Sequence, residues 1–144
     1  MRLLCRRHSG ITLFELCLST AIIGIFAMMA VPSINRAQQS YGLTAIAHEV
    51  RTELHRARIL AIVRNEDCRL HVTSNSEYRV ECQTPAWVPI QLYEMRTGYT
   101  VRANNRPEFH PLGNVGPMAT ITVSNAIGEE RRIIVSRSGR IRME

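Results

Sequence analysis

The chain has 144 residues, which is enough for one domain and short for two. Its formal net charge is +6, its hydrophobic content is 45%, and all 18 of its basic side chains are arginines. Three of these arginines precede residue 10 and all 12 acidic residues follow it. The remainder is therefore only mildly basic, which does not by itself indicate a nucleic-acid-binding protein.

Two segments precede the bulk of the chain. Residues 1–10 form a basic leader with three arginines. Residues 11–31 are apolar, and Glu15 is the one charged residue among them. A helix of that length spans about 30 Å, which matches the hydrocarbon core of a membrane. The basic flank predicts that the N-terminus stays in the cytoplasm and that the rest of the chain is translocated.

An amphipathic helix is predicted over residues 32–64. Its apolar residues recur every three or four positions and so make one stripe along a helix. With residues 11–31 it would form one long helix, bent near Pro32. The stripe consists of Leu43, Ile46, Ala47, Val50, Leu54, Ala57 and Ala61.

A β-hairpin is predicted after this helix. Residues 69–73 and 77–81 alternate between apolar and polar side chains, with turn-forming residues between them. If the turn centres on Asn75, Cys68 lies opposite Cys82 at a separation that suits a disulfide. A translocated domain favours that bond, and the alternative is two small buried thiols.

Further strands complete the β domain that we expect over residues 65–144. Residues 106–117 hold three prolines and two glycines and are predicted to form a loop. A helix followed by antiparallel strands is an α+β fold. The remaining strand candidates are 90–95, 99–103, 119–124, 132–136 and 140–143.

Glu15 lies about one turn inside the apolar segment, where a charge costs free energy in a membrane. In one interpretation the segment is a plain signal-anchor and the carboxylate reaches the membrane surface. In a second it is a cleaved secretory signal, although Glu15 interrupts it and no suitable small-residue cleavage site follows. In a third the chain is cut after Gly10, and Glu15 pairs with the α-amine of Ile11 of another subunit.

The N-terminal pattern resembles the class III signal of type IV prepilins. Gly10 stands at the cleavage position, Ile11 follows it, Glu15 is residue five after the cut, and Pro32 is residue 22. The resemblance implies that a prepilin peptidase cleaves after Gly10 and methylates the amine of Ile11. It also implies that the helix is held in the inner membrane and then extracted into a filament.

Two further stretches resemble the GspH/FimT family of minor pseudopilins, namely residues 54–72 and 131–143. The family implies a long N-terminal helix packed on a domain of two antiparallel sheets. It implies a Gram-negative inner-membrane location with the C-terminal domain in the periplasm. The expected function is that of a minor subunit near the tip of a type II secretion pseudopilus or a type IV pilus. Expected partners are other pilins, the prepilin peptidase, the inner-membrane assembly platform and membrane lipid.

DNA binding is the alternative function. Some type IV members of the family bind DNA through a C-terminal Gly-Arg-x-Arg, and this chain has that pattern at 139–142. Strand alternation puts Arg140 and Arg142 on one face, with Arg137 nearby, and such a patch could hold phosphates. The competing interpretation is the solvated face of a half-buried strand.

No residue pattern predicts catalysis or a bound metal. His48 and His55 share a helix face without a metal-binding spacing, His71 lies in a predicted strand, and His110 lies in a predicted loop. We expect surface or half-buried histidines, no cofactor and no enzymatic activity. Trp87 is expected in the core or at a sheet edge, and the alternative is an interface.

Overall fold

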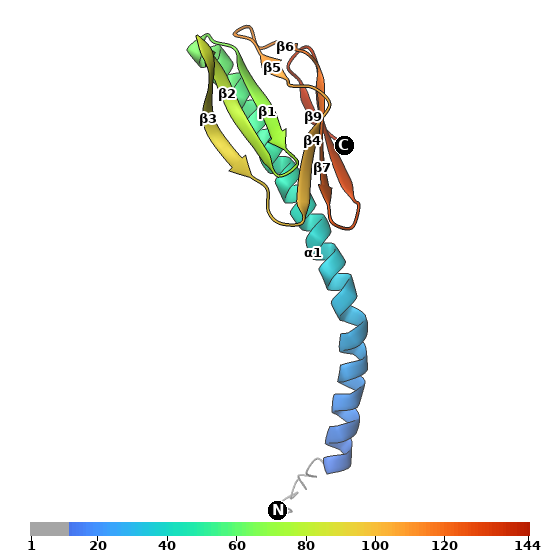
Figure 1. Ribbon diagram of the computed structural model, residues 1–144. Coiled ribbons are helices and arrows are strands. Elements are labelled where there is room, and N and C mark those ends of the chain that lie inside the picture. The colour runs from blue at the N-terminus through green and yellow to red at the C-terminus, as the bar shows by residue number, and fades with distance from the viewer. Residues whose placement is uncertain (1–11) are drawn as a thin grey trace, which may run out of the picture. The chain divides into compact units, whose positions relative to one another are not determined.

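The computed structural model describes residues 12–144, with the backbone alone for 29–32. The chain divides into two compact units, Met1–Gln38 and Gln39–Glu144. The helix α1, Leu13–Arg64, contributes to both of them (Figure 1). Pro32 lies within this helix, and the bend expected there remains a prediction.

The described part of the first unit is the N-terminal half of α1. This helix is long and apolar enough to cross a membrane, with a mean hydropathy of 2.1 over its most apolar window. The described side chains from Thr12 to Met28 are all exposed, on every side of the helix. An apolar surface all around a helix requires lipid or neighbouring protein in place of water.

The second unit begins with the amphipathic half of α1. Every residue of the predicted apolar stripe is buried, from Leu43 to Ala61, so the 3.6-residue period is confirmed. The helix ends because Asn65 has a φ of +54°. The Glu66 N–H then donates to the Ala61 carbonyl at 3.2 Å, which closes the last turn as a Schellman-type cap.

The first sheet has the strand order β3-β2-β1-β5-β6. The predicted hairpin is confirmed, since Cys68 pairs with Cys82 and Val72 with Tyr78, before a bulge between Val72 and Ser74. The two last strands of this sheet lie inside the segment that was predicted to be a loop. Its strands are β1 Cys68–Ser74, β2 Glu77–Thr84, β3 Ala86–Glu94, β5 Glu108–Phe109 and β6 Val115–Gly116.

The second sheet has the strand order β4-β7-β8-β9 and is entirely antiparallel. Along β7 each odd-numbered residue is buried and each even-numbered one is half-buried, which is the alternation of a sheet with one face on the core. Its strands are β4 Tyr99–Ala103, β7 Ala119–Asn125, β8 Glu130–Val135 and β9 Ile141–Met143.

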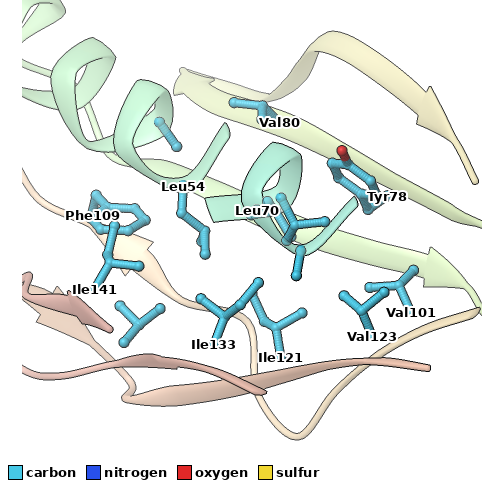
Figure 2. Close-up of a cluster of buried hydrophobic side chains, with 14 of the residues drawn as sticks. Leu54, Leu70, Tyr78, Val80, Val101, Phe109, Ile121, Val123, Ile133 and Ile141 are labelled. Atoms are coloured by element: carbon cyan, nitrogen blue, oxygen red, sulfur yellow. The ribbon is translucent and has the colours of Figure 1, made fainter. Parts of the chain in front are cut away.

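Both sheets and the helix share one hydrophobic core (Figure 2). Leu54 comes from α1, Leu70 and Tyr78 from the first sheet, and Ile121 and Ile133 from the second. These side chains are at most 2% exposed, and each buried one stabilises the fold by about 1.5–3 kcal/mol. The α+β prediction with two antiparallel sheets is confirmed.

Candidate functional site

Thr12 and Glu15 stand at the start of α1. The Glu15 N–H donates to Thr12 Oγ1 at 3.3 Å, and the Thr12 N–H donates to Glu15 Oε2 at 3.4 Å. This reciprocal pair is a capping box, which satisfies two backbone donors that a helix start leaves free. The pattern Thr-x-x-Glu is the sequence signal of this capping box, and Glu15 therefore has a capping role besides its charge.

The apolar side chains on both sides of Glu15 are presented outward. Leu13, Phe14, Ile23, Phe26 and Met28 are between 66% and 82% exposed. The Ser19 and Thr20 hydroxyls donate to carbonyls of the preceding turn, so they are satisfied within the helix. This half of α1 can therefore enter a hydrocarbon layer or a bundle of helices without unsatisfied hydroxyl groups.

Gly10 and Ile11, the predicted cleavage and methylation residues, lie outside the described residues. Cleavage after Gly10 would leave Thr12 as the second residue of the mature chain. The helix that carries Glu15 would then begin almost at the new N-terminus, since α1 starts at Leu13.

Cys68 and Cys82 are joined by a disulfide across the β1–β2 hairpin, with a Cα–Cα separation of 4.1 Å. Both residues are at most 2% exposed. Their positions directly opposite each other follow from the hairpin register. The bond connects two strands at the end of the sheet where β1 also pairs with β5.

Three arginines near the C-terminus are exposed, namely Arg137, Arg140 and Arg142. Ile141, between the last two, is buried at 7% exposure, so Arg140 and Arg142 point away from the core. No ion pair to these three arginines is present within residues 12–144. Arg140 and Arg142 therefore lie on the exposed side of this segment, and their role in DNA binding stays a prediction.

Gly139 has a packing role. It adopts a φ of +76°, and a Cβ there would collide with the Gly113 carbonyl oxygen and lie 3.0 Å from Arg58 Nε. Gly113 also has a positive φ, and the Val115 N–H donates to the Arg137 carbonyl at 2.9 Å. Two turns therefore close over the guanidinium of Arg58, and the glycine allows their approach.

Glu81 is a buried carboxylate, 2% exposed, on the side of the first sheet away from α1. Arg69 Nε donates to it at 2.8 Å, and Arg79 and His71 also contact it. Burial alone would raise the pKa of Glu81. The hydrogen bond and charge of Arg69, with Arg79 and His71, outweigh burial and hold that pKa below its usual value.

Trp87 and His110, which the sequence analysis also considered, make contacts within the fold. Trp87 lies half-buried on the edge strand β3, and the Arg69 guanidinium stacks 3.8 Å from its ring centroid. His110 contacts Asp67 at 2.7 Å. Among the described residues no cluster of potential metal ligands is found. The Arg69–Trp87 and Asp67–His110 contacts join segments that are far apart in sequence. No local sequence pattern could therefore have predicted them.

Comparison with known proteins supports the same family. A family model described as type II transport protein GspH matches residues 47–139. No curated protein sequence matches the chain significantly.

The fold is similar to three solved structures. The minor pseudopilin EpsH of the Vibrio cholerae type 2 secretion system is 13% identical, with a TM-score of 0.63 over 71% of this chain and 95% of that one. The type IV minor pilin FimU of Pseudomonas aeruginosa is 18% identical, with a TM-score of 0.59 over 71% and 92%. GspH of Escherichia coli is 17% identical, with a TM-score of 0.57 over 68% and 84%.

The family model covers the end of α1 and nearly the whole β domain, and the three structures each match 68% or 71% of this chain. The chain therefore belongs to the GspH family of type II transport proteins and has the type IV pilin-like fold of a minor pseudopilin.

Proposed function

We propose that this chain is a minor subunit built into a periplasmic filament near its tip, in a type II secretion pseudopilus or a type IV pilus. It supports protein secretion or pilus assembly through structure and not through catalysis. The observation that carries the proposal is the apolar half of α1, whose exposed apolar side chains surround the single carboxylate of Glu15 at the start of the helix.

Two environments suit that surface. Before assembly, the inner membrane would hold α1, with the basic leader in the cytoplasm and the β domain in the periplasm. After a prepilin peptidase cuts behind Gly10, the assembly platform would move the helix into a bundle with the helices of other pilins. The α-amine of Ile11 in one subunit would then offer Glu15 of another a partner of opposite charge.

The test is the mature N-terminus. Protein is purified from cells with and without a prepilin peptidase, and the N-terminal peptide is measured by mass spectrometry. The expected product begins at a methylated Ile11 only when the peptidase is present. An intact leader in both strains would reject processing, and with it the filament proposal. Co-purification with filaments sheared from cells gives the second, independent measurement.

DNA binding at the C-terminus is the second candidate. It is favoured by the exposure of Arg137, Arg140 and Arg142 and by the lack of carboxylate partners for them within residues 12–144. Phosphate contacts of this kind would be independent of base sequence and would weaken as salt is raised.

A gel-shift experiment at low salt tests this candidate. The Arg140→Ala, Arg142→Ala double variant should lose most of the binding. Arg96→Ala, which removes an exposed arginine from the loop between β3 and β4, should keep it. If the wild-type chain shifts no DNA at low salt, the candidate is rejected.

A further inference from the structure

A groove of about 750 Å³ lies between the two sheets. Its walls come from β1 of the first sheet and β4 of the second, which lie side by side without pairing (Figure 1). One wall is Val72, Thr73 and Ser74 of β1, and the other is Val101, Arg102 and Ala103 of β4.

Both walls are strand edges without a partner strand. β1 pairs with β5 only at Cys68 and Arg69, so its edge over residues 70–74 is free on that side. β4 is the edge strand of its sheet and pairs only with β7. Within residues 12–144, the backbone hydrogen bond that joins β4 to the hairpin runs from the Val101 N–H to the Asn75 carbonyl, at 2.8 Å. Free edges of this kind hydrogen-bond readily to an added strand.

The groove is lined by three arginines and one acidic residue. Arg69 is already paired with Glu81 at 2.8 Å and contacts Glu108 at 3.5 Å. Arg102 and Arg106 make no ion pair with any carboxylate of the described chain and are both exposed. Two cations are therefore free in the groove, one on β4 and one in the segment that follows it, and they select for a negatively charged occupant.

We propose that this groove binds an extended, carboxylate-rich segment of another subunit of the same filament. The segment pairs its backbone with the free edge of β1, and its carboxylates contact Arg102 and Arg106. The identity of the partner rests on the proposed filament function, whereas the peptide chemistry rests on the groove alone. The interface would fix a neighbour to the β domain, in addition to any packing of α1.

The first experiment measures peptide binding to the full chain in detergent micelles. The probe is a fluorescent, capped peptide of about seven residues in which valine and glutamate alternate, because a strand of that length spans roughly 23 Å. Saturable binding is expected in fluorescence anisotropy. Arg102→Gln with Arg106→Gln should weaken it about tenfold, the effect of losing two exposed charge contacts of up to about 1 kcal/mol each.

Two controls separate edge pairing from simple charge attraction. Arg142→Gln removes an exposed arginine that does not line the groove, and it should leave the affinity unchanged. A peptide with the same side chains but N-methylated backbone amides should lose binding, because it cannot donate to the strand edge. Equal binding by the double variant, or by the N-methylated peptide, would overturn the proposal, as would no binding by the wild-type chain.

The partner is tested in cells. A photo-crosslinking residue replaces Thr73, which is exposed in the groove, or, as a control, Ile127, which is exposed and does not line the groove. A covalent adduct with another filament subunit is expected from position 73 and not from 127. Adducts with other proteins alone would overturn the assignment of the partner.

The groove proposal and the proposed function can fail separately. A wild-type chain that enters filaments but binds no peptide would overturn the groove proposal alone. A chain that binds peptide but never enters filaments defeats the proposed function.

Discussion

Thr12 and Glu15 cap the first turn of α1 from both directions, each side chain accepting a hydrogen bond from the backbone N–H of the other. The carboxylate thus has a role in the single subunit as well as the proposed one between subunits. A capping box needs a side-chain acceptor at this position, and glutamine serves as well as glutamate. Pairing with the amine of a neighbour needs the negative charge.

Glu15→Gln separates these two roles. The variant should be inserted and cleaved like the wild-type chain and keep the helix cap, yet enter filaments at least about tenfold less, since a buried ion pair broken on one side costs about 3–5 kcal/mol. The measurement is the amount of chain in sheared filaments relative to the membrane. Glu15→Leu should be equally defective. Full assembly of the glutamine variant would show that capping alone explains the residue.

Removal of the disulfide should destabilise the β domain. Replacing Cys68 and Cys82 by alanine opens a cross-link with a sequence separation of 14, which is worth about 3 kcal/mol in the chain-entropy model. Urea unfolding under oxidising conditions should show this loss. The control is the wild-type chain under reducing conditions, which should approach the variant. Mass spectrometry should find the oxidised chain lighter by two hydrogens, and an unchanged mass on reduction would contradict the bond.

Gly139→Ala should cost more stability than Gly128→Ala. Both glycines have positive φ values, +76° and +84°, so both variants strain the backbone by about 1–2 kcal/mol. No atom lies within 4 Å of a Cβ at Gly128, whereas Gly139 meets Gly113 and Arg58. Overpacking should add about 1–3 kcal/mol at Gly139. Equal losses in urea unfolding would contradict the close approach of the two turns.

His71 should make the fold less stable in mild acid. Burial, followed by the positive charge of Arg106, holds the pKa of His71 below its usual 6.5. The unfolded chain therefore binds this proton at a higher pH than the folded chain does, and stability falls as the pH drops through about 6.5. His71→Gln removes the group, so its loss of stability between about pH 7.5 and about pH 5.5 should be smaller. An identical pH slope in urea unfolding would contradict this expectation.

Much of the fold could be predicted because it rests on periodicity. The helical stripe and the hairpin register follow from spacings of 3.6 and 2 residues, and both are observed. β3 begins at Ala86, earlier than the predicted 90, and includes Pro89, a residue type that is disfavoured inside strands. β3 is an edge strand, and an edge strand tolerates proline. The order of strands in a sheet depends on contacts between distant segments and cannot be predicted from local sequence.

The candidate site was only partly predictable, because the short strands beside it show no periodicity. β5 and β6 have two residues each, too few to show any alternation. β5 pairs with β1 only at Cys68 and Arg69, which leaves the rest of that edge of β1 free beside β4. The groove and the exposure of Arg102 and Arg106 in it thus depend on contacts between distant segments.

Gly139 also bears on how such chains are classified. The glycine of its Gly-Arg-x-Arg stretch is required by the two turns that close over Arg58, whatever the neighbouring arginines contact. A match of four letters that includes this glycine is therefore explained in this chain by the packing of the two turns, and it does not by itself indicate DNA binding. The discriminating information lies in the arginines: how many there are, which face they share, and whether carboxylates neutralise them.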